Sequence, residues 1–110
     1  MEIQEYNPLY KQAIIDQTKR DINDPKILEF TKLGLETETK HCLIALEEGK
    51  FKGYLLGYPV NKDICLILHW SSRDKRTGVK LGIRYLKMIK ALGYKYYEYC
   101  RNDKYIRRRL

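Results

Sequence analysis

The sequence contains no long hydrophobic run, no paired cysteines and fewer acidic than basic residues. No stretch of about 18 apolar residues occurs, so we exclude a membrane-spanning helix. The N-terminal stretch MEIQEYNPLY lacks the apolar core of a signal peptide. Cys42, Cys65 and Cys100 lie far apart, and without a C-x-x-C pair they predict neither a disulfide framework nor a zinc site. We therefore expect small buried cysteines, no metal and a reducing, cytoplasmic location.

What the sequence does have is positive charge. Lysine and arginine number 22 against 14 acidic residues, which gives a formal net charge of +8. The cations concentrate in residues 73–84 and 101–109. Such an excess favours polyanionic partners, namely phosphorylated cofactors, nucleic acid or acidic proteins. For either segment alone, solvated surface charge is the simpler interpretation.

The length of 110 residues and an apolar fraction of 44% fit one globular domain spanning residues 1–110. Asn7-Pro8 and Asp24-Pro25 each predict a helix start, because Asn or Asp caps the free N–H groups and proline lacks an N–H at a position where none is needed. Gly34 is a suitable stop for the second helix. The strands predicted in this part of the chain are 2–6, 41–46, 51–60 and 64–70.

The last third of the chain predicts a helix over residues 77–92, a stop at Gly93 and a strand over residues 94–100. A strand that returns after a helix lies parallel to its predecessor, so this is a β-α-β crossover. Asn102 is a suitable cap for a last helix that runs to Leu110. The order β-α-α-β-β-β-α-β-(α) predicts an α+β fold, in which a mixed, mostly antiparallel sheet has helices on both faces.

The basic turn from Arg73 to Gly78 is the best candidate for a ligand site. It joins the end of a central strand to the start of a helix, where free N–H groups and the helix dipole favour phosphate. Lys75 and Arg76 add positive charge, and Gly78 lets a ligand approach the backbone closely. Together these features predict a pyrophosphate site, with a charged surface loop as the alternative.

In element order and in this turn, the chain resembles the GNAT acyltransferase superfamily. Members carry a signature, Arg or Gln-x-x-Gly-x-Gly or Ala, whose backbone amides hold the pyrophosphate of acetyl-coenzyme A. When ALGYKYYEY is matched to the family's helix end and fifth strand, the signature falls on residues 73–78. Arg73 and Gly78 then match, and Arg76 replaces the first glycine. The stretch NDKYIRRRL begins like the family's last motif, an asparagine followed by a helix.

The resemblance implies acetyl-coenzyme A as cofactor and an amine as acyl acceptor. The backbone near Leu68 would pair with the pantetheine arm, and the basic turn with the start of its helix would hold the pyrophosphate. The side chain of Arg76 would either cap the phosphates or obstruct them. The cofactor-binding residues implied in this way are Leu68, Arg73, Lys75, Arg76, Thr77, Gly78, Val79 and Asn102.

The family's catalytic side chains are less well matched. A glutamate on the fourth strand often serves as general base, but residues 64–70 contain no carboxylate and offer only His69. A tyrosine often protonates the departing thiolate; Arg109 occupies its position, and Tyr105 lies one helical turn earlier. A lone histidine beside a tryptophan, or one of ten tyrosines, also fits a structural role. The family's closing helix and seventh strand are not matched, so a C-terminally shortened domain is expected.

Two classes of function therefore stay open. The first is an acyl-CoA-dependent N-acyltransferase that acts mainly through proximity and orientation. The second is a GNAT-fold protein without catalysis, of the kind that tailed phages encode and that occurs in virions, which acts by binding protein or nucleic acid. An open sheet edge would also allow a homodimer. Coenzyme A binding separates the two classes, and nucleic-acid binding would weaken steeply with salt.

Overall fold

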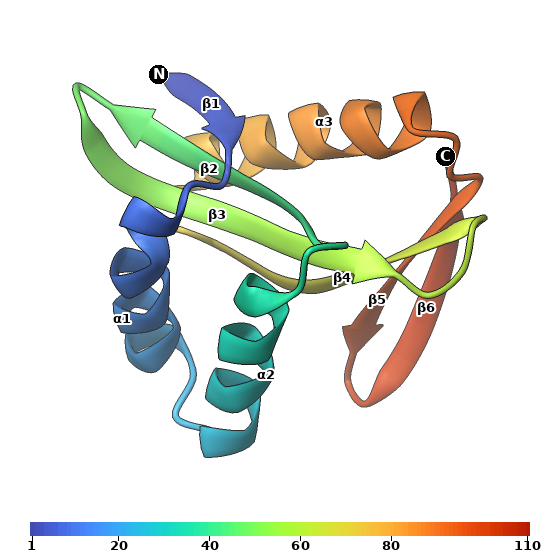
Figure 1. The fold of residues 1–110 in the computed structure, drawn as a ribbon, viewed down its shortest axis with the longest axis horizontal. Coiled ribbons are helices and arrows are strands. Elements are labelled where there is room, and N and C mark those ends of the chain that lie inside the picture. The colour runs from blue at the N-terminus through green and yellow to red at the C-terminus, as the bar shows by residue number, and fades with distance from the viewer.

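Six strands form one sheet in the order β1-β2-β3-β4-β5-β6 in the computed structural model, which describes residues 1–110 (Figure 1). The strands are β1 (Glu2–Glu5), β2 (His41–Glu47), β3 (Lys50–Pro59), β4 (Ile64–Ser72), β5 (Tyr96–Arg101) and β6 (Lys104–Arg109). The helices are α1 (Lys11–Asp21), α2 (Pro25–Glu36) and α3 (Lys75–Ala91), with a short 3-10 turn, Pro8–Tyr10, before α1. The predicted α+β class is confirmed.

Neighbouring strands in the sequence are neighbours in the sheet. The first four strands pair antiparallel. Short turns join β2 to β3 and β3 to β4, whereas α1 and α2 lie between β1 and β2. After α3, β5 returns parallel to β4, so the predicted crossover is confirmed. The two open edges of the sheet are β1 and β6.

The helices lie on opposite faces of this sheet, α1 and α2 on one face and α3 on the other (Figure 1). Side-chain alternation along β3 separates two cores. Tyr54 and Leu56 pack in the core under α1 and α2, while Leu55 packs with Tyr85 of α3. Tyr85 is fully buried, and its hydroxyl donates to the carbonyl oxygen of His41 at 3.0 Å.

The helix start predicted at Asp24-Pro25 is confirmed, and the one predicted at Asn7-Pro8 opens a 3-10 turn that leads into α1 at Lys11, but one helix stop is wrong. The side chains of Asn7 and Asp24 each accept a hydrogen bond from the backbone N–H two residues later, which caps the 3-10 turn and α2. Gly34 does not end α2, which continues to Glu36. Gly34 is instead buried, and a Cβ built there would lie 3.1 Å from the Leu56 side chain. The glycine therefore serves close packing of α2 on the sheet.

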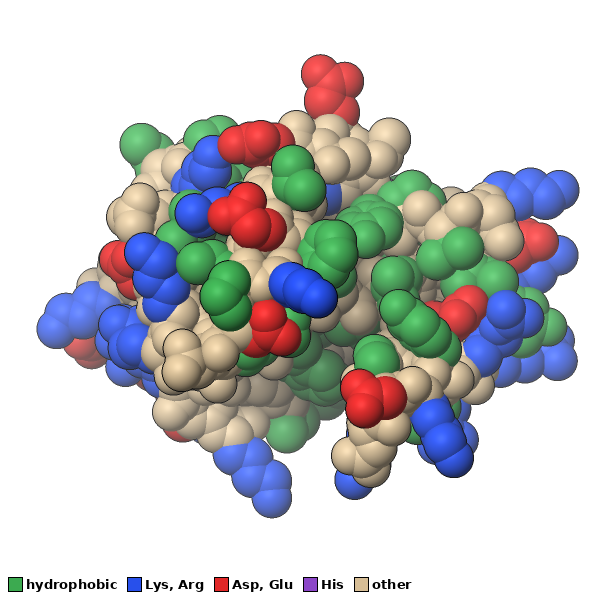
Figure 2. All heavy atoms as spheres, turned by 90° about the horizontal axis from the view of Figure 1, so that it is seen from below, with side chains coloured by type: hydrophobic (Ala, Val, Ile, Leu, Met, Phe, Trp, Pro, Cys, Tyr) green, Lys and Arg blue, Asp and Glu red, His purple; other side chains and the backbone are tan.

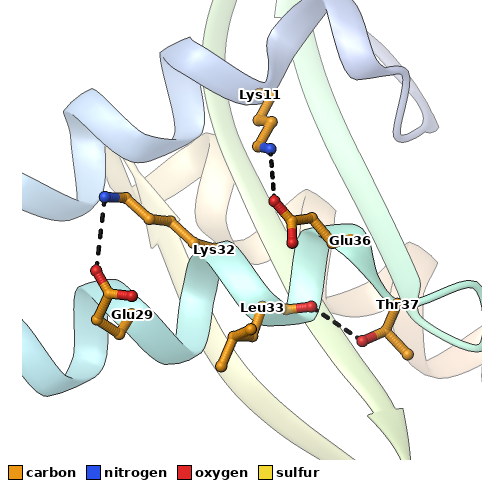
Figure 3. Close-up of polar contacts among 6 residues, drawn as sticks. All are labelled: Lys11, Glu29, Lys32, Leu33, Glu36 and Thr37. Carbon is orange, nitrogen blue, oxygen red and sulfur yellow. Dashed lines mark hydrogen bonds and ion pairs between the residues drawn. The ribbon is translucent and has the colours of Figure 1, made fainter.

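One exposed ion pair connects the two helices that share a face, and further polar contacts lie within α2. Lys11 of α1 and Glu36 of α2 form an ion pair at 3.0 Å, and Thr37 Oγ1 donates to the Leu33 carbonyl oxygen at 2.9 Å at the end of α2 (Figure 3). Both charged side chains are substantially exposed, so the pair contributes at most about 1 kcal/mol. Burial of the apolar faces of α1 and α2 is therefore the main force that holds them on the sheet.

The last predicted helix, from Asn102 to Leu110, is wrong. Residues of β6 pair antiparallel with β5 in a hairpin instead. Asn102 and Asp103 form its two-residue turn with φ values of 53° and 61°. Asn and Asp tolerate this left-handed conformation, and a turn with two such residues matches the twist of a hairpin. Asn102 is therefore a turn residue and not a helix cap.

Composition led to two further expectations. Cys42 and Cys65 are buried as predicted, but Cys100 is exposed. The reason is that it lies near the end of β5 in the hairpin, beyond the part of the sheet that the helices cover. No helix is long and apolar enough to cross a membrane.

Candidate functional site

A cleft opens where the two parallel strands of the sheet diverge. β4 and β5 pair only over residues 64–66 and 96–98, although each strand continues beyond that point. The space between them has a volume of about 480 Å³. Its lining is mostly apolar and aromatic and consists of Ile67, Leu68, His69, Trp70, Tyr97, Tyr99 and Cys100.

A β-bulge in β4 shapes the wall of this cleft. Leu56 of β3 faces His69, while the next residue of β3, Gly57, faces Ile67, so Leu68 has no opposite residue. Leu68 also lies beyond the last pair with β5. Leu68 therefore has no register partner in either neighbouring strand, at the position predicted for the pantetheine arm.

The basic turn contains a capped helix start. Asp74 is the N-cap of α3, so the helix begins at Lys75, two residues earlier than predicted. The Asp74 carboxylate accepts hydrogen bonds from Thr77 N at 2.8 Å and from Thr77 Oγ1 at 3.1 Å. These bonds hold the pKa of Asp74 below its ordinary value, because they favour the charged carboxylate. Thr77 is fully buried, and its amide and hydroxyl groups are already bonded to Asp74. They are therefore not free to contact a ligand as predicted.

The other predicted groups of the turn are free. The backbone N–H groups of Lys75 and Arg76 precede the first hydrogen bond of the helix, and no loop or cap bond uses them. The side chains of Arg73, Lys75 and Arg76 are exposed. Together they make the start of α3 cationic despite Asp74.

Trp70 lies against the first turns of α3. Its Nε1 donates to the Gly78 carbonyl oxygen at 3.1 Å. A Cβ at Gly82 would lie 2.5 Å from the indole ring, so a glycine is required there for this contact. At Gly78 a Cβ would lie 2.8 Å from Ser72 Oγ. Val79, the last predicted cofactor-binding residue of this helix, is half exposed.

His69 faces α1 and belongs to a chain of hydrogen bonds. Its Nδ1 is bonded to the Tyr54 hydroxyl, which lies 2.6 Å from the Thr18 hydroxyl. Thr18 Oγ1 in turn donates to the Ile14 carbonyl oxygen at 2.8 Å. Burial lowers the pKa of His69, and the nearby Asp21 carboxylate partly opposes this. His69 is therefore mainly neutral at pH 7, and its Nε2 has no hydrogen-bond partner in the protein.

A second polar connection runs beside the first. Gln17 Nε2 donates to Ser71 Oγ at 2.7 Å, and Ser71 Oγ donates to the Asp21 carboxylate. Sequence reasoning sought a carboxylate only on the strand that contains His69, and so missed Asp21 at the end of α1. The available signal was the pattern of polar residues at 17, 18 and 21 on a helix with an otherwise apolar buried face.

The tyrosine proposed from the sequence lies on the hairpin. Tyr105 is 71% exposed, pairs with Cys100 and is not part of the cleft lining. Tyr105 does not lie one helical turn before residue 109, because that segment is a strand. Tyr97 and Tyr99, whose rings stack with centroids 6.1 Å apart, line the cleft instead.

Comparison with known proteins identifies the fold of the chain. No family model and no curated protein matches the chain, but solved structures do. The aminoglycoside 6'-N-acetyltransferase from Enterococcus faecium superposes with a TM-score of 0.78 at 15% identity, over 90% of this chain and 60% of that one. An acetyltransferase of the GNAT family from Staphylococcus aureus Mu50 superposes with a TM-score of 0.72 at 18% identity, over 93% and 73%. The chain has the GNAT fold.

One further structure with the GNAT fold bears on the cofactor. An aminoglycoside 6'-N-acetyltransferase complexed with coenzyme A superposes with a TM-score of 0.77 at 14% identity, over 90% of this chain and 61% of that one. The chain thus spans about 60% of the length of the two aminoglycoside acetyltransferases. At these identities the likeness establishes the fold and leaves activity and substrate to be proposed.

Proposed function

We propose that the protein is an acyl-CoA-dependent N-acyltransferase that acylates an amine. The supporting observation is the cleft between β4 and β5, whose Trp70 wall contacts the first turn of α3. An apolar cleft beside a helix N-terminus suits a ligand with a thioester on a long arm and a pyrophosphate at the other end.

The residues fit such a cofactor, with one opposing charge. Leu68 has no register partner on the β5 side, where an amide-containing arm would lie, and the free N–H groups of Lys75 and Arg76 are available to phosphate oxygens. The Arg76 side chain is exposed, which favours capping of the phosphates over obstruction. Asp74 acts against binding, because its carboxylate already occupies the helix start.

The cleft also holds groups for proton transfer. Bound acyl-coenzyme A would supply the activated acyl group as a thioester, whose carbon–sulfur bond would break as the amide bond to the acceptor nitrogen forms. His69 Nε2 would accept the proton that the nitrogen loses, because the imidazole is neutral near pH 7. Tyr99 lines the same cleft, and its hydroxyl would donate a proton to the departing sulfur. Positioning of the two reactants would supply much of the acceleration.

Calorimetric titration with acetyl-coenzyme A tests the proposal. We expect saturable binding to the wild type and loss of binding in Gly78→Trp, which adds bulk at the first turn of α3. Lys90→Trp is the matched control, because it adds the same side chain to the exposed last turn of the same helix. The proposal is refuted if wild-type protein that is folded by circular dichroism does not bind acetyl-coenzyme A at millimolar concentration.

Asp74→Asn gives a sharper form of the same test. Asparagine caps a helix as well as aspartate does, so the structure of the turn is kept while its negative charge is removed. If the pyrophosphate binds here, affinity for acetyl-coenzyme A rises about two- to five-fold. An unchanged or weaker affinity would place the ligand elsewhere.

A second candidate is a binding protein with the GNAT fold and no catalysis. The observation that favours it is the Asp74 cap, which takes the Thr77 amide out of phosphate binding. The hairpin of β5 and β6 would supply its contact surface. Figure 2 shows Lys and Arg side chains projecting from both ends of one face, with hydrophobic side chains gathered between them. Failure to bind acetyl-coenzyme A, together with salt-dependent retention of single-stranded nucleic acid, would favour this candidate.

A further inference from the structure

We propose that Tyr54 and Thr18 are positioning residues that hold His69 as the Nδ1–H tautomer, so that Nε2 is left as the proton acceptor at the cleft. The use of Nε2 in catalysis rests on the proposed function, whereas the tautomer does not. The observation that supports it is the chain of hydrogen bonds from His69 through Tyr54 and Thr18 to the Ile14 carbonyl group.

The direction of every proton in this chain follows from its last member. A carbonyl oxygen only accepts, so the 2.8 Å contact between Thr18 Oγ1 and the Ile14 oxygen requires the Thr18 proton. Thr18 then has no proton left for Tyr54, and their 2.6 Å contact requires the proton of Tyr54. Tyr54 in turn has none left for His69, so Nδ1 must donate to the phenol oxygen. The proton on Nδ1 leaves the lone pair on Nε2.

Burial makes this order robust. Tyr54 and Thr18 are both fully buried, so no bulk water competes for their hydroxyl groups. Burial also raises the pKa of Tyr54, which keeps the phenol protonated and able to donate to Thr18. Hydrogen bonds that point the same way along a chain reinforce one another in a low-dielectric interior.

The hydrogen-bond chain also accommodates the protonated product. When Nε2 takes up a proton, the imidazolium keeps its existing bond from Nδ1 to Tyr54, so no rearrangement is needed. The Asp21 carboxylate, held by Ser71, is the charged group that acts on this ring, and it offsets part of the desolvation cost. The chain Gln17–Ser71–Asp21 therefore supports the same reaction from the end of α1.

Nitrogen-15 NMR of the histidine rings tests the tautomer directly. The chain has only two histidines, and His41→Gln assigns the remaining signals to His69. At pH 8, above the ordinary histidine pKa of 6.5, we expect Nδ1 of His69 to show the shift of a protonated nitrogen and Nε2 that of an unprotonated one. The opposite assignment in the wild type overturns the inference.

Two variants test the cause. Thr18→Val removes the acceptor for Tyr54, whose proton then turns to His69, and the ring proton moves to Nε2. Tyr54→Phe removes the acceptor for Nδ1–H and has the same effect. Thr18→Ser and Tyr58→Phe are the matched controls and keep the wild-type tautomer, because Ser retains the hydroxyl and the Tyr58 hydroxyl makes no hydrogen bond. An unchanged tautomer in both Thr18→Val and Tyr54→Phe overturns the inference.

The outcome is independent of the proposed function. The expected NMR result without binding of acetyl-coenzyme A would leave the tautomer established and remove its catalytic use. Binding with the opposite tautomer would keep the proposed function and assign the proton transfer to another group. If both hold, Thr18→Val is expected to lower the maximal rate about ten-fold or more with little change in the Michaelis constant for acetyl-coenzyme A.

Discussion

Gly57→Ala is expected to destabilise the protein severely, although it adds only one methyl group. A Cβ at this position would lie 2.3 Å from Tyr85 Oη and 2.5 Å from the backbone oxygen of Leu66. Tyr85 is fully buried, and moving its ring breaks the bond to the His41 carbonyl oxygen. Overpacking costs roughly 1–3 kcal/mol, and a broken buried hydrogen bond costs about 1–3 kcal/mol more. Alanine is about 0.5–1 kcal/mol more favourable than glycine in a strand, which offsets part of this cost. We therefore expect the free energy of unfolding to fall by about 3 kcal/mol.

Urea denaturation followed by far-ultraviolet circular dichroism measures this loss, and a double-mutant cycle assigns it. Tyr85→Phe alone destabilises, because it removes the bond to His41. In the Gly57→Ala background the same change also removes one of the two close contacts, so it should cost at least about 1 kcal/mol less. The double variant stays less stable than Tyr85→Phe, because the contact with Leu66 persists. A loss below about 1 kcal/mol for Gly57→Ala, or strict additivity in the cycle, would refute the reasoning.

Three other predictions follow from the same structure. Burial lowers the pKa values of His41 and His69, so the unfolded chain binds protons at a higher pH than the folded chain does. The free energy of unfolding therefore falls as the pH drops below about 6.5. His69→Gln should reduce this pH dependence in urea titrations between pH 5 and 8. Gly82→Ala should displace the Trp70 ring and change the fluorescence of the only tryptophan, while stability changes by less than about 1 kcal/mol, because the helix gains what the lost hydrogen bond costs. Asp103→Gly should raise stability by roughly 0.5–1 kcal/mol in thermal melts, because glycine adopts the left-handed turn without strain, whereas Asp103→Val should lower it.

Local chemistry made most of the fold predictable. Asn7 and Asp24 could be predicted as the caps of the 3-10 turn and of α2, because capping depends only on neighbouring residues. The stop at Gly93 after α3 could be predicted for the same reason. The last segment defeated this kind of reasoning. Asn102 is equally suited to a helix cap and to a left-handed turn, and the choice depended on whether the following residues could pair with β5. Sequence periodicity over six residues does not contain that information.

The candidate site was harder to predict because its residues come together through long-range contacts. The basic turn was found from sequence, since strand, turn and helix are contiguous there. The contact between Trp70 and Gly82 was missed, although the two residues lie close in the chain, because it depends on how α3 packs on the sheet. The pairing of Asp21 with Ser71 joins residues 50 positions apart, so the polar residues on α1 indicate Asp21 but not its partner.

The bulge at Leu68 explains why side-chain alternation along β4 does not predict the hydrogen bond between His69 and Tyr54. Strict alternation would place His69 on the same face as Cys65 and Ile67, which pack under α3. One extra residue in β4 reverses this relation, so that His69 turns to Tyr54 and the α1 face while Trp70 turns to α3. Gly57 sits at this shift and allows it, because a Cβ there would meet the Leu66 backbone oxygen. A single glycine in β3 is therefore needed both for the packing of Tyr85 and for the position of the proposed base.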